Sequence, residues 1–124
     1  MKLFLVSAGV LAGLSVVLGA FAAHGLKNKI PENLLNAFQT GVDYQLFHSL
    51  AIILIVILAK QYPNNMWASS AGALLAGIVL FSGSLYGLAL TSWKWLGPIT
   101  PIGGVAFIVG WILFVLAAYK SVEI

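Results

Sequence analysis

Two histidines and one aspartate are the side chains of this sequence best suited to chemistry. His24 closes the first long apolar run, and Asp43 and His48 lie near the start of the second. Imidazole and carboxylate groups exchange protons and ligate metal ions. Gln45 adds an amide that both donates and accepts hydrogen bonds. The sequence therefore predicts a candidate polar site of His24, Asp43, Gln45 and His48.

Helical geometry limits what these residues can do together. At 100° per residue, Asp43 and His48 point about 140° apart, so we expect Asp43 to meet His24 instead. Zinc has suitable ligand types here, but this separation argues against a metal site. No Ser/His/Asp motif is present and cysteine is absent, so no catalytic residue and no cofactor is predicted. Four residues are predicted to support the site: Gln39, Tyr44, Tyr86 and Thr100.

Each candidate also has a purely structural interpretation. Asp43 is expected either to be solvated at the membrane interface or to bond a helix N-terminus. His48 is equally well described as a neutral imidazole that bonds locally to Tyr44 or Gln45. His24 fits an ordinary interfacial position.

The composition places most of the surface in lipid. Of 124 residues, 61% are hydrophobic and only 7% are charged, whereas soluble domains carry about 25% charged residues. The six lysines stand singly beside the apolar runs, as lysines do at membrane edges, and form no basic block. Membrane lipids are thus the expected partners, and nucleic acid is not.

Four apolar segments are long enough to cross a bilayer, which takes roughly 20 residues. The predicted spans are 3–23, 41–60, 68–90 and 100–119. Short connections make consecutive helices antiparallel. The predicted fold is therefore a single all-α domain, an integral membrane four-helix antiparallel bundle. Lys2 and Ala20-Phe21-Ala22 imitate a cleaved secretory signal, but the first run is longer than a signal core.

Helix boundaries carry recognisable residues. Pro31 suits a first helical turn, Asn64 or Asn65 suits the cap of the third helix, and Thr100 suits the cap of the fourth. An aromatic belt at the membrane edges is predicted, comprising Trp67, Trp93, Trp95 and Tyr119. A second membrane span that begins near Gly41 places His48 about 10 Å inside one edge, at 1.5 Å per residue.

Small residues recur at four-residue spacing and predict close helix packing. The expected packing glycines are Gly9, Gly13, Gly19, Gly83, Gly87, Gly103 and Gly104. Such stripes serve contacts within one chain or, alternatively, between copies. A homo-oligomer is therefore a possible assembly.

Three stretches carry a family resemblance: GAFAAHGLK, FQTGVDYQLFHSLAI and LTSWKWLGPITPIGGVAFIVGW. In this order they resemble the domain of unknown function 423 family, also called uncharacterised protein family 0382 and, in animals, transmembrane protein 256. The resemblance implies a membrane protein of four spans without an established activity. It supplies no catalytic residue for this chain.

Three functions fit these observations, in decreasing order of preference. The first is a non-enzymatic lipid-interacting or accessory protein. The second is an oligomeric channel or carrier for protons or a small polar solute, lined by the polar candidates. The third is a lipid-modifying enzyme that uses His24 and Asp43 as an acid/base pair. The expected location is the cell membrane, with several crossings and with the termini placed in the cytoplasm.

Overall fold

Four long helical segments form the molecule in a computed structural model that describes residues 1–123. All four are long and apolar enough to cross a membrane, which confirms the predicted all-α membrane bundle. In chain order the elements are α1 (Lys2–Phe21), η1 (Ala22–Leu26), α2 (Glu32–Gln61), α3 (Asn65–Gly77), η2 (Ile78–Ser82), α4 (Gly83–Thr91), η3 (Lys94–Leu96) and α5 (Ile99–Ser121). The elements η1 and η2 are π-helical turns, and η3 is a 3₁₀ turn.

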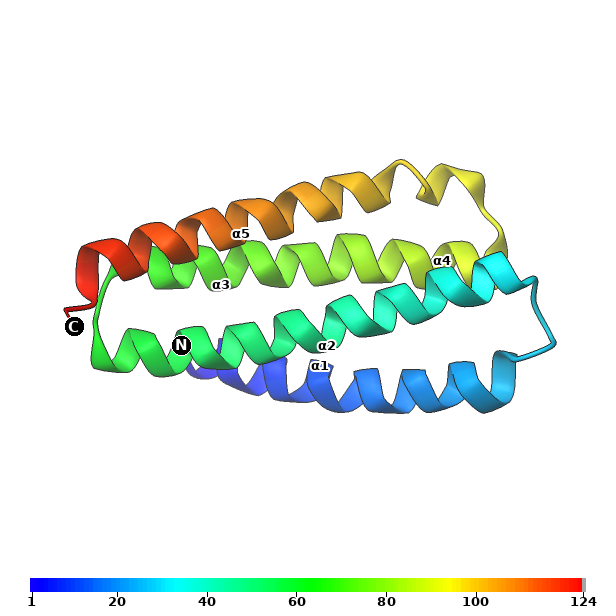
Figure 1. The fold of residues 1–124 in the computed structure, drawn as a ribbon, viewed down its shortest axis with the longest axis horizontal. Coiled ribbons are helices and arrows are strands. Elements are labelled where there is room, and N and C mark those ends of the chain that lie inside the picture. Colours follow the sequence, from blue (N-terminus) through cyan, green and yellow to red (C-terminus); the bar gives the residue numbers. More distant parts are fainter. Residues whose placement is uncertain (124) are drawn as a thin grey trace.

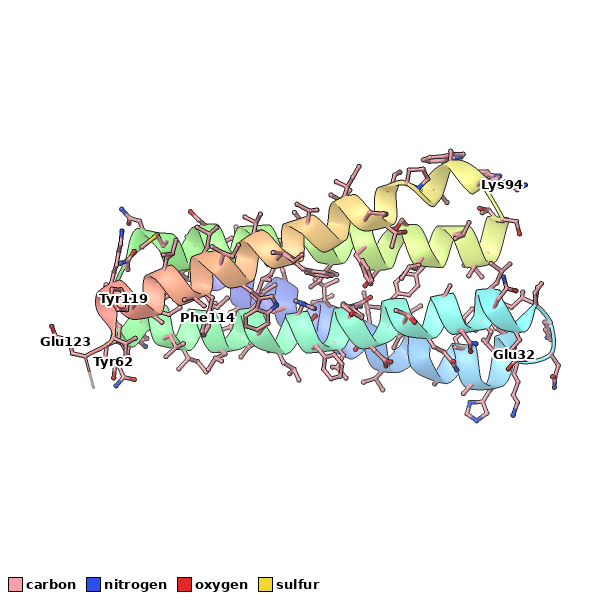
Figure 2. The ribbon with its side chains drawn as sticks, turned by 45° about the horizontal axis from the view of Figure 1, so that its top comes forward. Glu32, Tyr62, Lys94, Phe114, Tyr119 and Glu123 are labelled. Atoms are coloured by element: carbon pink, nitrogen blue, oxygen red, sulfur yellow. The ribbon has the colours of Figure 1, made fainter. Side chains whose placement is uncertain are left out.

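The helices form two antiparallel pairs that pack side by side (Figure 1). One pair is α1 with α2, and the other is the continuous segment α3–η2–α4 with α5. Helix α2 also packs along α3, η2 and α4, and so joins the two pairs. Glu32 and Lys94 lie at one end of the bundle, and Tyr62, Tyr119 and Glu123 lie at the other (Figure 2).

One helix start agrees with the sequence prediction and another differs from it. Helix α2 begins at Glu32, directly after Pro31 as predicted, and runs for 30 residues to Gln61. His48 is therefore about 24 Å from the start of α2, near its middle, at 1.5 Å per residue. Helix α5 begins at Ile99, so Thr100 lies inside the first turn and is not its cap.

One predicted cap and most of the predicted belt agree with the structure. Asn64 caps α3 by accepting a 2.9 Å hydrogen bond from the backbone N–H of Met66. Trp93, Trp95 and Tyr119 are exposed near helix ends. Trp67 is not a belt residue, since it is fully buried and donates its indole N–H to the carbonyl of Tyr62 at 2.8 Å.

The core follows α2. The larger apolar cluster contains Ile52, Ile55, Trp67, Leu74 and Phe107, and a smaller one surrounds Phe38 near the opposite end. Valine, leucine and isoleucine side chains cover much of the outside, as lipid contact requires. Within residues 1–123, every buried side-chain nitrogen and oxygen has a hydrogen-bond partner.

The glycines predicted for packing fall into two groups. A Cβ at Gly103 would collide with the backbone of Phe81, and one at Gly87 would lie 2.7 Å from Leu96. The others with a neighbour are Gly19, 3.4 Å from Val42, and Gly104, 4.0 Å from Phe81. By contrast, a Cβ at Gly9, Gly13 or Gly83 would meet no atom within 4 Å.

Candidate functional site

A groove of about 500 Å³ lies between α2 and α5, with η2 contributing to its wall. Its size falls within the range of small-molecule sites, about 300–1,000 Å³. Nine residues line it: Tyr44, His48, Phe81, Pro101, Gly104, Val105, Phe107, Ile108 and Trp111. Most are apolar or aromatic, and His48 supplies a polar group.

His48 is held on both ring nitrogens. Nδ1 bonds the carbonyl oxygen of Tyr44 at 2.8 Å, and the indole N–H of Trp111 donates to Nε2 at 3.1 Å. The indole N–H is only a donor and the carbonyl only an acceptor. His48 therefore carries its proton on Nδ1 and is neutral in this arrangement.

Aromatic rings fix the plane of the imidazole. The ring of His48 stacks on Phe107, with centroids 3.7 Å apart and planes 17° apart. Tyr44 stacks on the same imidazole at 5.8 Å. Phe107 can occupy this position because Gly77 faces it: a Cβ at Gly77 would collide with the Phe107 ring. The imidazole is thus oriented by α2, α3 and α5 together.

Phe81 reaches the groove from a π-helical turn. The turn η2 interrupts the α-helical segment at Ile78–Ser82 and packs against α5. Gly103 permits this contact, since the Phe81 backbone lies directly against it. Single π-turns within α-helices are frequent at functional sites. Here the turn places the Phe81 ring 4.5 Å from Tyr44 and 5.5 Å from Phe107.

Gln45 belongs to a different, buried network. Its Nε2 donates to the carbonyl of Leu11 in α1 at 2.7 Å, and its Oε1 accepts from the hydroxyl of Tyr86 in α4 at 2.6 Å. Nearby, Ser82 donates to the carbonyl of Gly41 at 2.7 Å. These bonds tie α2 to both neighbouring helices. Gln45 and Tyr86 were both predicted from the sequence, and the structure brings them together as a clamp between helices.

Thr100 links α5 to α4. Its hydroxyl lies 2.6 Å from that of Ser84, which in turn donates to the carbonyl of Phe81 at 2.9 Å. This contact lies one turn from Gly104, at the end of the groove. Thr100 thus fixes the position of the groove and does not line it.

The remaining candidates lie apart from the groove. Asp43 and Gln39 are exposed and border a shallow depression of about 270 Å³ with Gly19 and Val42. His24 is exposed and bonds the carbonyl of Ala20 in its own helix at 3.0 Å. Its predicted partnership with Asp43 does not appear among residues 1–123. Nor do three His, Asp or Glu side chains gather as a metal cluster in that range.

Trp111, Phe107 and Phe81 were not among the predicted site residues. Trp111 carried a signal: it lies near the middle of its helix, whereas Trp67, Trp93 and Trp95 lie near helix ends. An indole N–H at mid-membrane depth needs an acceptor, because lipid offers none. The two phenylalanines carried no comparable signal, since apolar rings are ordinary in a membrane helix.

Similarity to known proteins identifies the family of this chain. The model of a family described as "Protein of unknown function (DUF423)" matches residues 18–104. The chain belongs to this family. That match confirms the resemblance predicted from the three sequence stretches.

Full-length relatives give the same result. The chain is 49% identical to the UPF0382 membrane protein YwdK of Bacillus subtilis over 97% of this chain and 98% of that protein. It is 45% identical to a UPF0382 membrane protein of Staphylococcus aureus and 42% identical to one of Staphylococcus haemolyticus, again over nearly the whole of both chains. No solved structure matches significantly. This is therefore a multi-pass protein of an uncharacterised membrane family.

Proposed function

We propose that this protein is a non-enzymatic protein of the cell membrane that holds a lipid in the groove between α2 and α5. The observation that carries the proposal is the groove itself, about 500 Å³ in volume and lined almost entirely by apolar and aromatic side chains. A groove on the flank of a membrane bundle is filled from the lipid phase. Its occupant is therefore an apolar molecule or part of one.

The hydrogen bonding of the site supports binding rather than catalysis. Both ring nitrogens of His48 have partners, and the amide nitrogen and oxygen of Gln45 each bond a neighbouring helix, α1 and α4 respectively. General acid or base catalysis needs a side chain within hydrogen-bond reach of the reacting group. In the groove the polar groups instead hold helices together, while the aromatic rings offer contact surface.

Retention of lipid on purified protein tests the proposal. Native mass spectrometry of the full chain in mild detergent should detect bound lipid. Gly104→Val should reduce the lipid-bound fraction severalfold, because the added methyl groups enter the groove. Gly83→Val is the matched control, since Gly83 has open space around it and does not line the groove. Equal lipid retention by the wild type and both variants would overturn the proposal.

Self-association supports a second candidate, an oligomeric carrier for a small polar solute. The observation in its favour is that Gly9 and Gly13 form a small-residue stripe on α1, and that no neighbouring side chain among residues 1–123 lies within 4 Å of a Cβ added at either position. Such stripes let membrane helices approach closely. Flux through liposomes, compared between the wild type and His48→Ala, tests this candidate. If His48→Ala carries the same flux as the wild type, His48 is not part of a transport route.

A further inference from the structure

The bond between His48 and Trp111 lies on the groove wall, where a ligand can reach it. Both residues line the groove, and they face each other through Nε2 and Nε1. We propose that the lipid held here is a neutral lipid alcohol whose hydroxyl group inserts between these two nitrogens. This inference rests on the proposed lipid-binding function and specifies the chemistry of the ligand.

A hydroxyl group can bond both His48 and Trp111 once their own hydrogen bond has opened. Separated from Trp111, Nε2 of His48 is an acceptor, because Nδ1 keeps its proton on the Tyr44 carbonyl. The freed indole N–H is a donor. One hydroxyl group donates its proton to Nε2 of His48 and accepts the indole N–H of Trp111, so both groups keep a hydrogen-bond partner. An ester or ketone oxygen would bond only the indole and would leave the imidazole nitrogen without a partner.

The two residues differ in their freedom to move, which decides how the pair opens. His48 is 7% exposed and is stacked on Phe107. Trp111 is 41% exposed, and its ring meets the imidazole edge-on at 62°. The indole can therefore swing toward the lipid while the imidazole stays in place. The fixed acceptor is thus His48, and the adjustable donor is Trp111.

The depth of the pair selects a neutral ligand. His48 lies about 24 Å along α2, and Trp111 lies about 18 Å along α5, near the middle of each helix, at 1.5 Å per residue. Placing a charged group at the bilayer centre is expensive, so a phosphate or ammonium head group is disfavoured there. A diacylglycerol or a long-chain alcohol carries an uncharged hydroxyl that can reach this depth. Within 1–123, every lysine, glutamate and aspartate lies outside the lining of this groove.

Two ligands test the inference: an alcohol, and the same molecule with a methyl group in place of its hydroxyl hydrogen. The probes are dioleoylglycerol and its methyl ether, added to the delipidated full chain in mild detergent, with binding measured by native mass spectrometry. The ether keeps the acceptor oxygen but has no proton to donate to His48. We expect it to bind about three- to tenfold more weakly, the range of one net hydrogen bond. The His48→Phe variant keeps the stacked ring and should bind both probes equally.

The outcomes distinguish failure of the hydroxyl contact from failure of lipid binding itself. Preference for the alcohol in the wild type, lost in His48→Phe, supports the inference. Equal binding of the two probes by the wild type overturns the hydroxyl contact but leaves lipid binding intact. Binding of neither probe overturns both. If His48→Phe does not fold, the NMR signal of the Trp111 indole N–H in the wild type is measured instead. The inference predicts that dioleoylglycerol shifts this signal. An unchanged signal overturns the inference.

Discussion

The indole N–H of Trp111 donates a 3.1 Å hydrogen bond to Nε2 of His48, and this bond joins α5 to α2 inside the bundle. The two residues are 63 positions apart in the sequence. A bond between such distant positions depends on how α5 is rotated against α2. It is therefore a sensitive indicator of whether the helices pack as described.

A double-mutant cycle measures this bond. Trp111→Phe and His48→Leu each leave the other partner unpaired, so their effects on the free energy of unfolding should not add. Hydrogen bonds between membrane helices contribute about 0.6 kcal/mol on average and up to about 1.7 kcal/mol, and we expect a coupling energy in that range. Denaturation with sodium dodecyl sulfate provides the measurement. Strictly additive losses would show that the two side chains do not interact.

Gln45 should matter more than any other polar residue of α2. Gln45→Leu removes two hydrogen bonds and leaves the hydroxyl of Tyr86 without its acceptor. We expect unfolding to become easier by about 1–3 kcal/mol, the cost of leaving a buried polar group unpaired. Gln39→Leu is the matched control, because Gln39 is exposed and lies less than two turns away on the same helix. If Gln45→Leu and Gln39→Leu are equally stable, Gln45 does not act as a clamp between α1 and α4.

The packing of the glycines can be tested one position at a time. Gly103→Ala should destabilise the bundle by about 1–3 kcal/mol, because the new Cβ collides with the backbone of Phe81. Gly9→Ala should have little effect, since no atom lies within 4 Å of the added carbon. Unfolding in detergent again gives the comparison. A large loss in Gly9→Ala would instead reveal a neighbour of α1 from outside this chain.

Much of the fold could be predicted because lipid restricts the alternatives. Only nine of the 124 residues are charged, and uncharged segments of bilayer length leave little choice but spanning helices. The Asn64 cap was predictable because capping depends on a few consecutive residues. The start of α2 was predictable for the same reason, since Pro31 followed by Glu32 suits a first helical turn.

The candidate site was only partly predictable, for a similar reason. The local bond of His48 to Tyr44 follows from helical spacing, and the structure contains it. The contacts of Gln45 with Leu11 and of His48 with Trp111 join distant segments, and their existence depends on helix rotation. Periodicity within one helix does not determine that rotation. The groove between α2 and α5 was beyond prediction for the same reason.

Photo-cross-linking in lipid nanodiscs tests the central claim, that the groove holds a lipid. The probe is a diacylglycerol with a diazirine on one acyl chain, and the labelled residues are mapped by mass spectrometry. Labelling should concentrate on Tyr44, Phe81 and Trp111 relative to the exposed Val16 and Val17 of α1, and Gly104→Val should abolish that excess. Equal labelling of the groove and of α1, unchanged by Gly104→Val, would contradict the claim.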